Sequence, residues 1–267
     1  MISAAAAVQR ELWGGDPESW AEHAEAHNRP LFEALLDATL VGAGTRLLDV
    51  GCGSGLLVTL ASERGADVAG IDITPGLLAV ARRRLPAADL REGDMEDLPF
   101  ANGAFDVVTG VNSFQFAGDP VQALREAARV VRAGGLVAAS LFAAPERSES
   151  TVVHHALSAL SPPAAESEHA PFALSALGNL EAALTTAGLA VIAQGEVRCS
   201  WRYASMENAV RGLECSAGGA RAIRDAGEPA VRQALLAAMR PFEDAASGVV
   251  SMDNVFRWVV AQRPLSA

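Results

Sequence analysis

The stretch that decides the fold is residues 47–60, "LLDVGCGSGLLVTL". Largely apolar residues enter a glycine-rich turn and a second apolar segment follows, which predicts a buried strand, a tight turn and a helix. A dinucleotide-binding loop follows the pattern G-x-G-x-x-G after such a strand. Here the glycines are Gly51, Gly53 and Gly55, Leu56 fills the sixth position, and Asp49 precedes them. The stretch therefore predicts a nucleotide-binding loop that departs from the dinucleotide pattern.

The carboxylate of Asp49 indicates which nucleotide this is. Glycines let the backbone approach a ligand closely, and the N-terminus of the following helix favours an anion. A pyrophosphate beside Asp49 would bring two like charges into a confined site. A ligand that carries ammonium and sulfonium groups suits the same carboxylate. This argument favours S-adenosylmethionine over NAD.

Strands and helices alternate through the first part of the chain, as in an α/β protein whose parallel sheet is covered by helices on both faces. A helical N-terminal segment over 8–40, interrupted near Gly14-Gly15 and Pro30, precedes them. The expected strands are 46–50, 66–72, 88–94, 105–111, 136–142, 189–197 and 255–262. The expected helices run from the glycine turn to Glu63, from Thr74-Pro75 to about Leu85, over 119–132, over 175–187 and within 204–246.

We interpret the chain as one domain with no internal repeat. Residues 1–42 are expected to form an N-terminal helical lid and 43–142 the cofactor-binding core. Residues 143–173 are polar and rich in proline, and they predict a cap over the carboxyl ends of the strands, where ligands bind in open α/β sheets. Residues 204–246 predict a helical insertion between two late strands.

Two further acids follow the next strands. Asp72 closes the second strand about 20 residues after the glycine loop, where a carboxylate accepts hydrogen bonds from ribose hydroxyls. Asp94 follows the third strand, where it can accept from the adenine amino group, and Met95 can lie on the base and donate its backbone N–H. Both acids have an alternative interpretation, which is to cap a helix or a turn.

The motifs together resemble the class I S-adenosylmethionine-dependent methyltransferases, in particular the group of ubiquinone/menaquinone-biosynthesis and small-molecule methyltransferases. The resemblance covers about 90 residues, in the family's order. It rests on "LLDVGCGSG" (47–55), "GID" (70–72), "EGDMEDLPF" (92–100), "FDVV" (105–108) and "ALREAARVVRAGG" (123–135). It implies a Rossmann-like, doubly wound seven-stranded sheet whose last strand is antiparallel.

The resemblance also implies site residues. Around the cofactor it places Asp49, Gly51, Cys52, Gly53 and Gly55 at the methionine part, Asp72 and Ile73 at the ribose, Asp94 and Met95 at the adenine, and Val111, Asn112, Ser113 and Gln115 at the sulfonium. For some of these positions a structural role is the alternative. Cys52 then fills the loop as a small residue, and the nearby Asp106 makes a contact at the start of a strand.

The methyl acceptor is less constrained by the sequence. His154, His155 and Gln115 are the candidate catalytic residues, since transfer requires alignment of the acceptor and in some cases removal of its proton. Asn112 is a second residue that can orient the acceptor. Surface positions are the alternative for the two histidines. Trp201, Tyr203 and Met206 line an apolar pocket or belong to the core.

Composition excludes several classes of function. The chain has 32 acids and 21 bases, net charge −11, and every base is arginine, which disfavours nucleic acid as a partner. The run Arg82–Arg84 is interpreted as a solvated helix face.

His23 and His27 stand four apart, but with no evident third ligand we expect no metal. No segment has the length and apolarity of a membrane span, and no signal peptide is recognised at the N-terminus. Three irregularly spaced cysteines predict a cytoplasmic protein.

The predicted function is methyl transfer from S-adenosylmethionine to oxygen, nitrogen or carbon of a small molecule by SN2 displacement, in a monomer or homodimer. "VNSFQF" after the fourth strand lacks the N/D-P-P-Y signature of enzymes that act on exocyclic or amide nitrogens. One alternative is the same fold and cofactor with other chemistry, such as cyclisation. Another is a non-catalytic module that binds the cofactor. An NAD-dependent dehydrogenase is disfavoured by Asp49 and Leu56.

Overall fold

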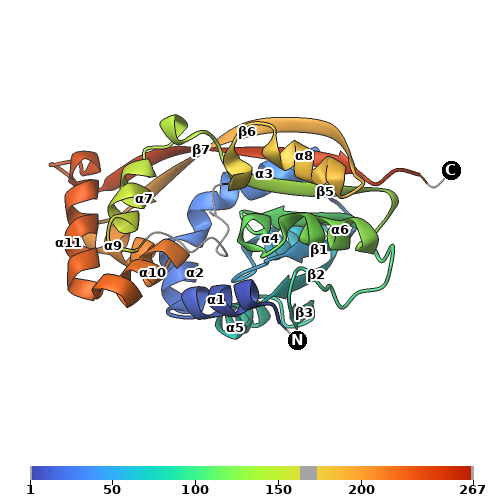
Figure 1. Cartoon of the computed structure of the whole chain (residues 1–267), viewed down its shortest axis with the longest axis horizontal. Helices are drawn as coiled ribbons and strands as arrows, with labels where there is room; N and C mark the ends of the chain where they lie inside the picture. The colour runs from blue at the N-terminus through green and yellow to red at the C-terminus, as the bar shows by residue number, and fades with distance from the viewer. Residues whose placement is uncertain (1, 163–172, 266–267) are drawn as a thin grey trace.

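The computed structural model describes residues 2–162 and 173–265, and its centre is a seven-stranded sheet (Figure 1). The strand order is β3-β2-β1-β4-β5-β7-β6. The strands are β1 (Arg46–Val50), β2 (Asp67–Asp72), β3 (Asp89–Glu92), β4 (Phe105–Val111), β5 (Val131–Phe142), β6 (Ala190–Tyr203) and β7 (Val250–Gln262).

Strand β1 occupies the middle of the parallel part of the sheet. It pairs in parallel with β2 on one side, with Asp49 opposite Gly70, and with β4 on the other, with Asp49 opposite Thr109. β5 continues the parallel sheet, and β7 runs antiparallel to both β5 and β6. The Rossmann-like sheet with an antiparallel last strand is thus confirmed.

Helices cover both faces of the sheet. On one face Leu36 of α3 (Arg29–Ala38), Leu57 of α4 (Leu56–Glu63) and Leu78 of α5 (Pro75–Arg84) share a buried cluster with Leu47 of β1. On the other face Leu124 of α6 (Pro120–Val130) and Leu180 of α8 (Asn179–Thr186) pack with Leu48. Leu47 and Leu48 are neighbours in β1, so their side chains point to opposite faces of the sheet and pack in two different cores. This is what a strand buried on both faces requires. Among the described residues no helix combines the length and apolarity needed to cross a membrane.

A separate helical group lies at one end of the molecule, at the left in Figure 1, where the long strands β6 and β7 project. It consists of α7 (Thr151–Ser158), α9 (Met206–Glu214), α10 (Ala217–Ala226) and α11 (Glu228–Met239). Val153, Leu213, Leu235 and Met252 of β7 are buried in its common core. The projecting strand ends supply one wall of this core, so the helical group is fixed to the sheet.

The N-terminal segment joins this helical group to the sheet. Its elements are α1 (Ala4–Trp13), α2 (Pro17–His23) and the 3-10 helix η1 (Glu25–Asn28). α2 contacts both α5 and α9, and α1 contacts α10. The predicted break near Gly14-Gly15 is present, because Asp16 caps α2 through a bond from Ser19 N and Pro17 follows it. The predicted break near Pro30 is present as well, because η1 ends at Asn28, α3 begins at Arg29 and Pro30 lies in the first turn of α3.

Several predicted boundaries were wrong, among them the start of the strand predicted over 136–142. β6 and β7 are longer than 189–197 and 255–262, because polar residues alternate with buried ones beyond those limits and hide the strand pattern. The helix predicted over 119–132 ends at Val130, and β5 starts at Val131. Val131 is already extended, with φ −75° and ψ 142°, and pairs with Phe105 of β4, and the register shifts between Phe105 and Val107.

We expect Leu235→Ala to destabilise the protein by about 3 kcal/mol, because Leu235 is fully buried in the helical group and its removal leaves a cavity. Chemical denaturation followed by circular dichroism measures this. Leu177→Ala is the control, since Leu177 is 91% exposed and its loss should change stability by at most about 0.5 kcal/mol. Equal effects of the two substitutions would contradict the assignment of this core.

Candidate functional site

The glycine loop between β1 and α4 combines tight packing with open space. Gly51, Gly53 and Gly55 have φ values of 75°, 54° and 87°, a region that favours glycine. A Cβ on Gly51 would lie 2.5 Å from Ser113 Cβ, and one on Gly55 would lie 2.8 Å from Ala81 Cβ. A Cβ on Gly53 would meet no described atom within 4 Å. Gly51 and Gly55 thus permit close packing, and Gly53 leaves room on its open side for a ligand.

The loop is anchored to the neighbouring strands by its backbone. Gly51 N and Cys52 N both donate to Ile71 O, at 2.8 and 3.0 Å. Ser113 Oγ donates to Val50 O at 2.6 Å. Cys52 is buried in the core, where a Cβ on Gly70 would touch its Sγ, and burial raises the pKa of its thiol. Cys52 and Ser113 therefore shape the loop with their side chains, and Cys52 offers a ligand only its backbone.

Asp49 is a buried carboxyl group beside this loop, 3% exposed. Its Oδ1 accepts a hydrogen bond from Thr109 Oγ1 at 2.7 Å. Burial raises the pKa of Asp49 to about 7, opposed by the Thr109 hydroxyl and reinforced by the charges of Asp72 and Glu25. A cation bound nearby would favour the ionised form. The site is therefore electrostatically suited to a positively charged ligand.

Asp72 and Asp94 are both held by backbone N–H groups. Asp72 accepts from Thr74 N and from Gly53 N, each at 2.8 Å, and burial raises its pKa. Asp94 accepts from Glu96 N at 3.1 Å and from Ser3 N at 2.9 Å. These bonds match the turn-capping alternative, yet an ionised carboxylate has about four lone-pair sites, so each can also accept from a ligand. Ile73 and Met95 beside them are half-buried.

The residues after β4 present unpaired acceptors. Asn112 has φ 52°, a strained conformation for a residue other than glycine, and its N donates to Ser140 O at 3.0 Å. The buried side-chain oxygens Asn112 Oδ1 and Gln115 Oε1 have no partner among the described residues. Buried polar atoms normally have partners, so these two oxygens are available to a ligand. Val111, just before them, is half-buried.

Aromatic rings from four elements meet beyond the end of β5. The ring of Phe142 lies 5.3 Å from that of His154 and 6.0 Å from that of Trp201, between centroids. The ring of His27 lies 4.4 Å from that of Tyr203 and 6.3 Å from that of Trp201. Burial lowers the pKa of His154 to about 4, with a smaller effect of His155, so its ring is neutral at physiological pH.

The residues predicted to contact the methyl acceptor do not all lie together in the structure. His154 faces the aromatic rings, whereas His155, on the next position of α7, is exposed. Tyr203 is 3% exposed and Met206 packs against the same cluster, so both belong to the core of the helical group. Trp201 is half-buried, and its Nε1 has no partner within the described part of the chain.

His23 and His27 do not share a helix face. His23 ends α2, whereas His27 lies in η1 with its Nε2 3.1 Å from Arg202 O. Burial lowers the pKa of His27. In residues 2–162 and 173–265 no group of three or more His, Cys, Asp or Glu side chains could hold a metal ion.

The interpretation of Arg82–Arg84 as a solvated face holds for Arg82 and Arg83, which are exposed, but not for Arg84, which is half-buried. Arg82 donates to Leu90 O at 2.9 Å, Arg83 pairs with Glu18, and Arg84 pairs with the buried Glu25. The last two pairs hold the N-terminal segment against α5. Sequence reasoning missed Glu25 and Ser3 as well, because their contacts join positions 59 and 91 residues apart and no local pattern marks them.

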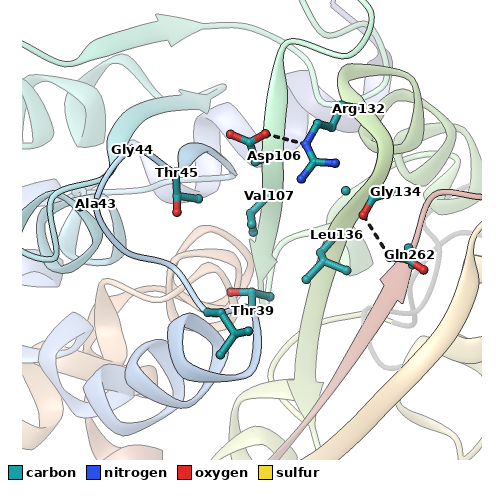
Figure 2. Close-up of a pocket in the computed structure, with 12 residues that line it drawn as sticks. Thr39, Ala43, Gly44, Thr45, Asp106, Val107, Arg132, Gly134, Leu136 and Gln262 are labelled. Atoms are coloured by element: carbon teal, nitrogen blue, oxygen red, sulfur yellow. Dashed lines mark hydrogen bonds and ion pairs between the residues drawn. The ribbon is translucent and has the colours of Figure 1, made fainter. Parts of the chain in front are cut away.

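A cavity of about 370 Å³ lies at the opposite edge of the sheet (Figure 2). Asp106, at the start of β4, pairs there with Arg46 at 3.0 Å and with Arg132 at 2.7 Å, and Arg46 holds the pKa of Asp106 well below its usual range. This matches the strand-start alternative for Asp106. The cavity faces the amino ends of the parallel strands, away from the glycine loop, so we do not assign it as the site.

Comparison with known proteins identifies the segment that contains the glycine loop. Residues 48–139 match the family model described as "Methyltransferase domain". Malonyl-(acyl-carrier protein) O-methyltransferase of Serratia marcescens is 38% identical over 121 residues, 45% of this chain and 48% of that protein. Demethylmenaquinone methyltransferase of Renibacterium salmoninarum is 36% identical over 111 residues, 42% of this chain and 47% of that protein. The matches thus span about half the length of these relatives.

Solved structures show the same fold over most of the chain. The cyclase SpnF aligns with a TM-score of 0.56 and 22% identity, over 88% of this chain and 80% of that one. A phosphoethanolamine N-methyltransferase of Haemonchus contortus, solved with S-adenosylhomocysteine, aligns with a TM-score of 0.55 and 18% identity, over 88% of this chain and 52% of that one. The family match and the shared fold agree with the resemblance seen in the motifs, and residues 48–139 form a methyltransferase domain.

Proposed function

We propose that this protein transfers a methyl group from S-adenosylmethionine to a small-molecule acceptor by direct SN2 displacement. The observation that carries the proposal is the buried Asp49 beside a loop in which Gly53 leaves room for a ligand. The match of residues 48–139 to the methyltransferase-domain family model supports it. When bound, S-adenosylmethionine supplies an activated methyl group on a sulfonium.

The residues at the carboxyl edge fit the parts of this cofactor. Asp49 would hold the amino-acid end, with Gly51, Gly53, Gly55 and the backbone of Cys52 around it. Asp72 and Ile73 would hold the ribose, and Asp94 and Met95 the adenine. Val111, Asn112 and Ser113 would border the sulfonium, where the unpaired Asn112 Oδ1 is an acceptor for a donor group or a partner for positive charge.

On the acceptor side the protein's task is alignment and exclusion of water. The half-buried rings of Phe142 and Trp201 suit an apolar or aromatic acceptor, and Gln115 Oε1 can orient it. The neutral ring of His154 can accept a proton from the acceptor as methyl transfer proceeds. His155 is exposed, and we assign it no role in catalysis.

The remaining segments complete the proposal. The N-terminal lid (1–42), the cap (143–173) and the insertion (204–246) would enclose the acceptor above the core (43–142); residues 163–172 of the cap lie outside the described part of the chain. With net charge −11 the acceptor is a small molecule rather than a nucleic acid. We propose a monomer or homodimer in the cytoplasm, without a metal and without membrane association.

A second function fits the same fold and cofactor, namely non-methylating chemistry such as cyclisation. The observation in its favour is the structural similarity to the cyclase SpnF. Mass spectrometry of products separates the two functions, because methylation adds one CH₂ unit to the acceptor and releases S-adenosylhomocysteine. Rearranged products of unchanged mass, with the cofactor intact, would favour the second function. Cofactor binding without any product would indicate a non-catalytic module.

We expect the affinity for S-adenosylmethionine to fall as the pH drops below about 7. Asp49 must be ionised to pair with the ammonium group. Below its raised pKa it is protonated in the free protein, and binding then has to expel that proton. Calorimetry across a pH series measures the dissociation constant, which should be constant above this pKa and rise below it.

Asp49→Asn should weaken cofactor binding about tenfold or more, because a charge-assisted contact is lost, and should abolish this pH dependence. Asp106→Asn is the matched control, since it removes an aspartate of a neighbouring strand far from the loop. An unchanged affinity in Asp49→Asn would contradict the placement of the ammonium group.

His154→Gln should lower kcat about 100-fold and leave the dissociation constant for S-adenosylmethionine unchanged, because the base is lost and the cofactor contacts remain. His155→Gln should behave as wild type. Steady-state assays with an acceptor identified in the product screen measure kcat for both variants, and calorimetry measures the dissociation constant for S-adenosylmethionine. A loss of activity confined to His155→Gln would reverse the assignment.

A further inference from the structure

Glu25 is a buried carboxylate that the proposed function does not use. It belongs to η1, outside the methyltransferase-domain segment 48–139, and is 4% exposed. Its Oε1 accepts a hydrogen bond from Leu56 N at 3.1 Å, and its Oε2 pairs with the guanidinium of Arg84. Leu56 is the first residue of α4, and Gly55 before it has no side chain that could cap the helix. Glu25 therefore caps this helix from a distant part of the sequence.

Arg84 extends the contact to the glycine loop itself. Its guanidinium donates to Ser54 O at 2.9 Å and to Ala21 O, in the N-terminal segment, at 3.5 Å. Ser54 and Leu56 flank Gly55, the loop residue with φ 87°. One ion pair thus fixes the carbonyl before this residue and the N–H after it, and it joins α5, the loop and the N-terminal segment.

We propose that Glu25 and Arg84 are positioning residues for the cofactor, which hold the turn at Ser54–Leu56 in its binding conformation and dock the N-terminal segment on it. This inference rests on the proposed function, since it assumes that the loop binds S-adenosylmethionine. The pair contacts the loop and not the ligand. Its loss should therefore act on cofactor affinity before it acts on the chemical step.

The charge of Glu25 provides a signature that a purely structural contact would lack. The charged and polar groups that face Asp49 are the Thr109 hydroxyl, Asp72 and Glu25, with Arg84 paired to Glu25. Glu25 contributes to the raised pKa of Asp49. Removing its negative charge should therefore lower the pH at which Asp49 ionises, and the pH profile of cofactor binding should move in the same direction.

The chain offers a matched control in the neighbouring ion pair. Glu18 of α2 pairs with Arg83 of α5, one residue before Arg84, so it also joins the N-terminal segment to α5. Its side chains are 69% and 58% exposed, and neither has a described contact to the glycine loop. Exposed pairs of this kind contribute little to stability. Glu18→Gln thus removes an equivalent link without touching the loop.

The experiment measures the dissociation constant of S-adenosylmethionine by calorimetry, across pH values on both sides of about 7, for wild type, Glu25→Gln, Glu25→Asp and Glu18→Gln. We expect Glu25→Gln to weaken binding about tenfold, as for a lost charge-assisted hydrogen bond, and to shift the pH midpoint downward. Glu25→Asp keeps the charge but retracts it by one methylene, so affinity should fall with an unchanged midpoint. Glu18→Gln should match wild type.

Wild-type affinity and pH midpoint in Glu25→Gln would overturn the inference, and so would equal effects of Glu25→Gln and Glu18→Gln. If circular dichroism shows that Glu25→Gln does not fold, the comparison of Glu25→Asp with Glu18→Gln decides, and equal affinities in those two variants overturn the inference. A wild-type protein that binds no S-adenosylmethionine at any pH would instead remove the proposed function, and this inference with it.

Discussion

The burial of the Asp49 carboxyl group is the constraint on which the rest of the site depends. Placing an acid at the end of a central strand costs free energy unless a partner compensates for it. The Thr109 hydroxyl on the adjacent strand supplies one hydrogen bond. Among the described residues Asp72 and Glu25 lie nearby and Arg84 pairs with Glu25, so the region retains an excess of negative charge. A cationic ligand completes this arrangement, which is why the loop suits a sulfonium-bearing amino acid better than a pyrophosphate.

The same edge of the sheet shows how the N-terminal segment becomes part of the site. Ser3 N donates to Asp94, Arg10 pairs with Glu92 at 2.8 Å, and Glu25 caps α4. Each contact falls on the carboxyl edge of the sheet or on the loop that follows it. The motif-bearing core thus supplies the loop and the acids, and the N-terminal segment contacts both. A ligand that reaches Asp94 has to share this carboxylate with Ser3 or displace it.

The core of the fold and the cofactor loop were predictable because their signals are local. The stretch 47–60 specifies strand, turn and helix within fourteen positions, and Asp72 and Asp94 follow their strands at family spacing. The full lengths of β6 and β7 were not predictable, because polar residues alternate with buried ones at their outer ends and interrupt the apolar pattern. The roles of Glu25 and Arg84 were hidden because a buried ion pair between distant segments exists only after the chain has folded. His154 and His155 looked alike in sequence, and only packing against Phe142 separates them.

A crystal structure with S-adenosylhomocysteine bound tests the central claim most directly, since it shows which edge of the sheet holds the cofactor. The account predicts the amino-acid end beside Asp49 and the open side of Gly53, the ribose at Asp72 and the adenine at Asp94. Density for the ligand at the amino edge of the sheet, in the cavity lined by Thr39 and Arg132, would contradict it. So would a loop that binds the ligand with no ligand atom near the Asp49 carboxyl group.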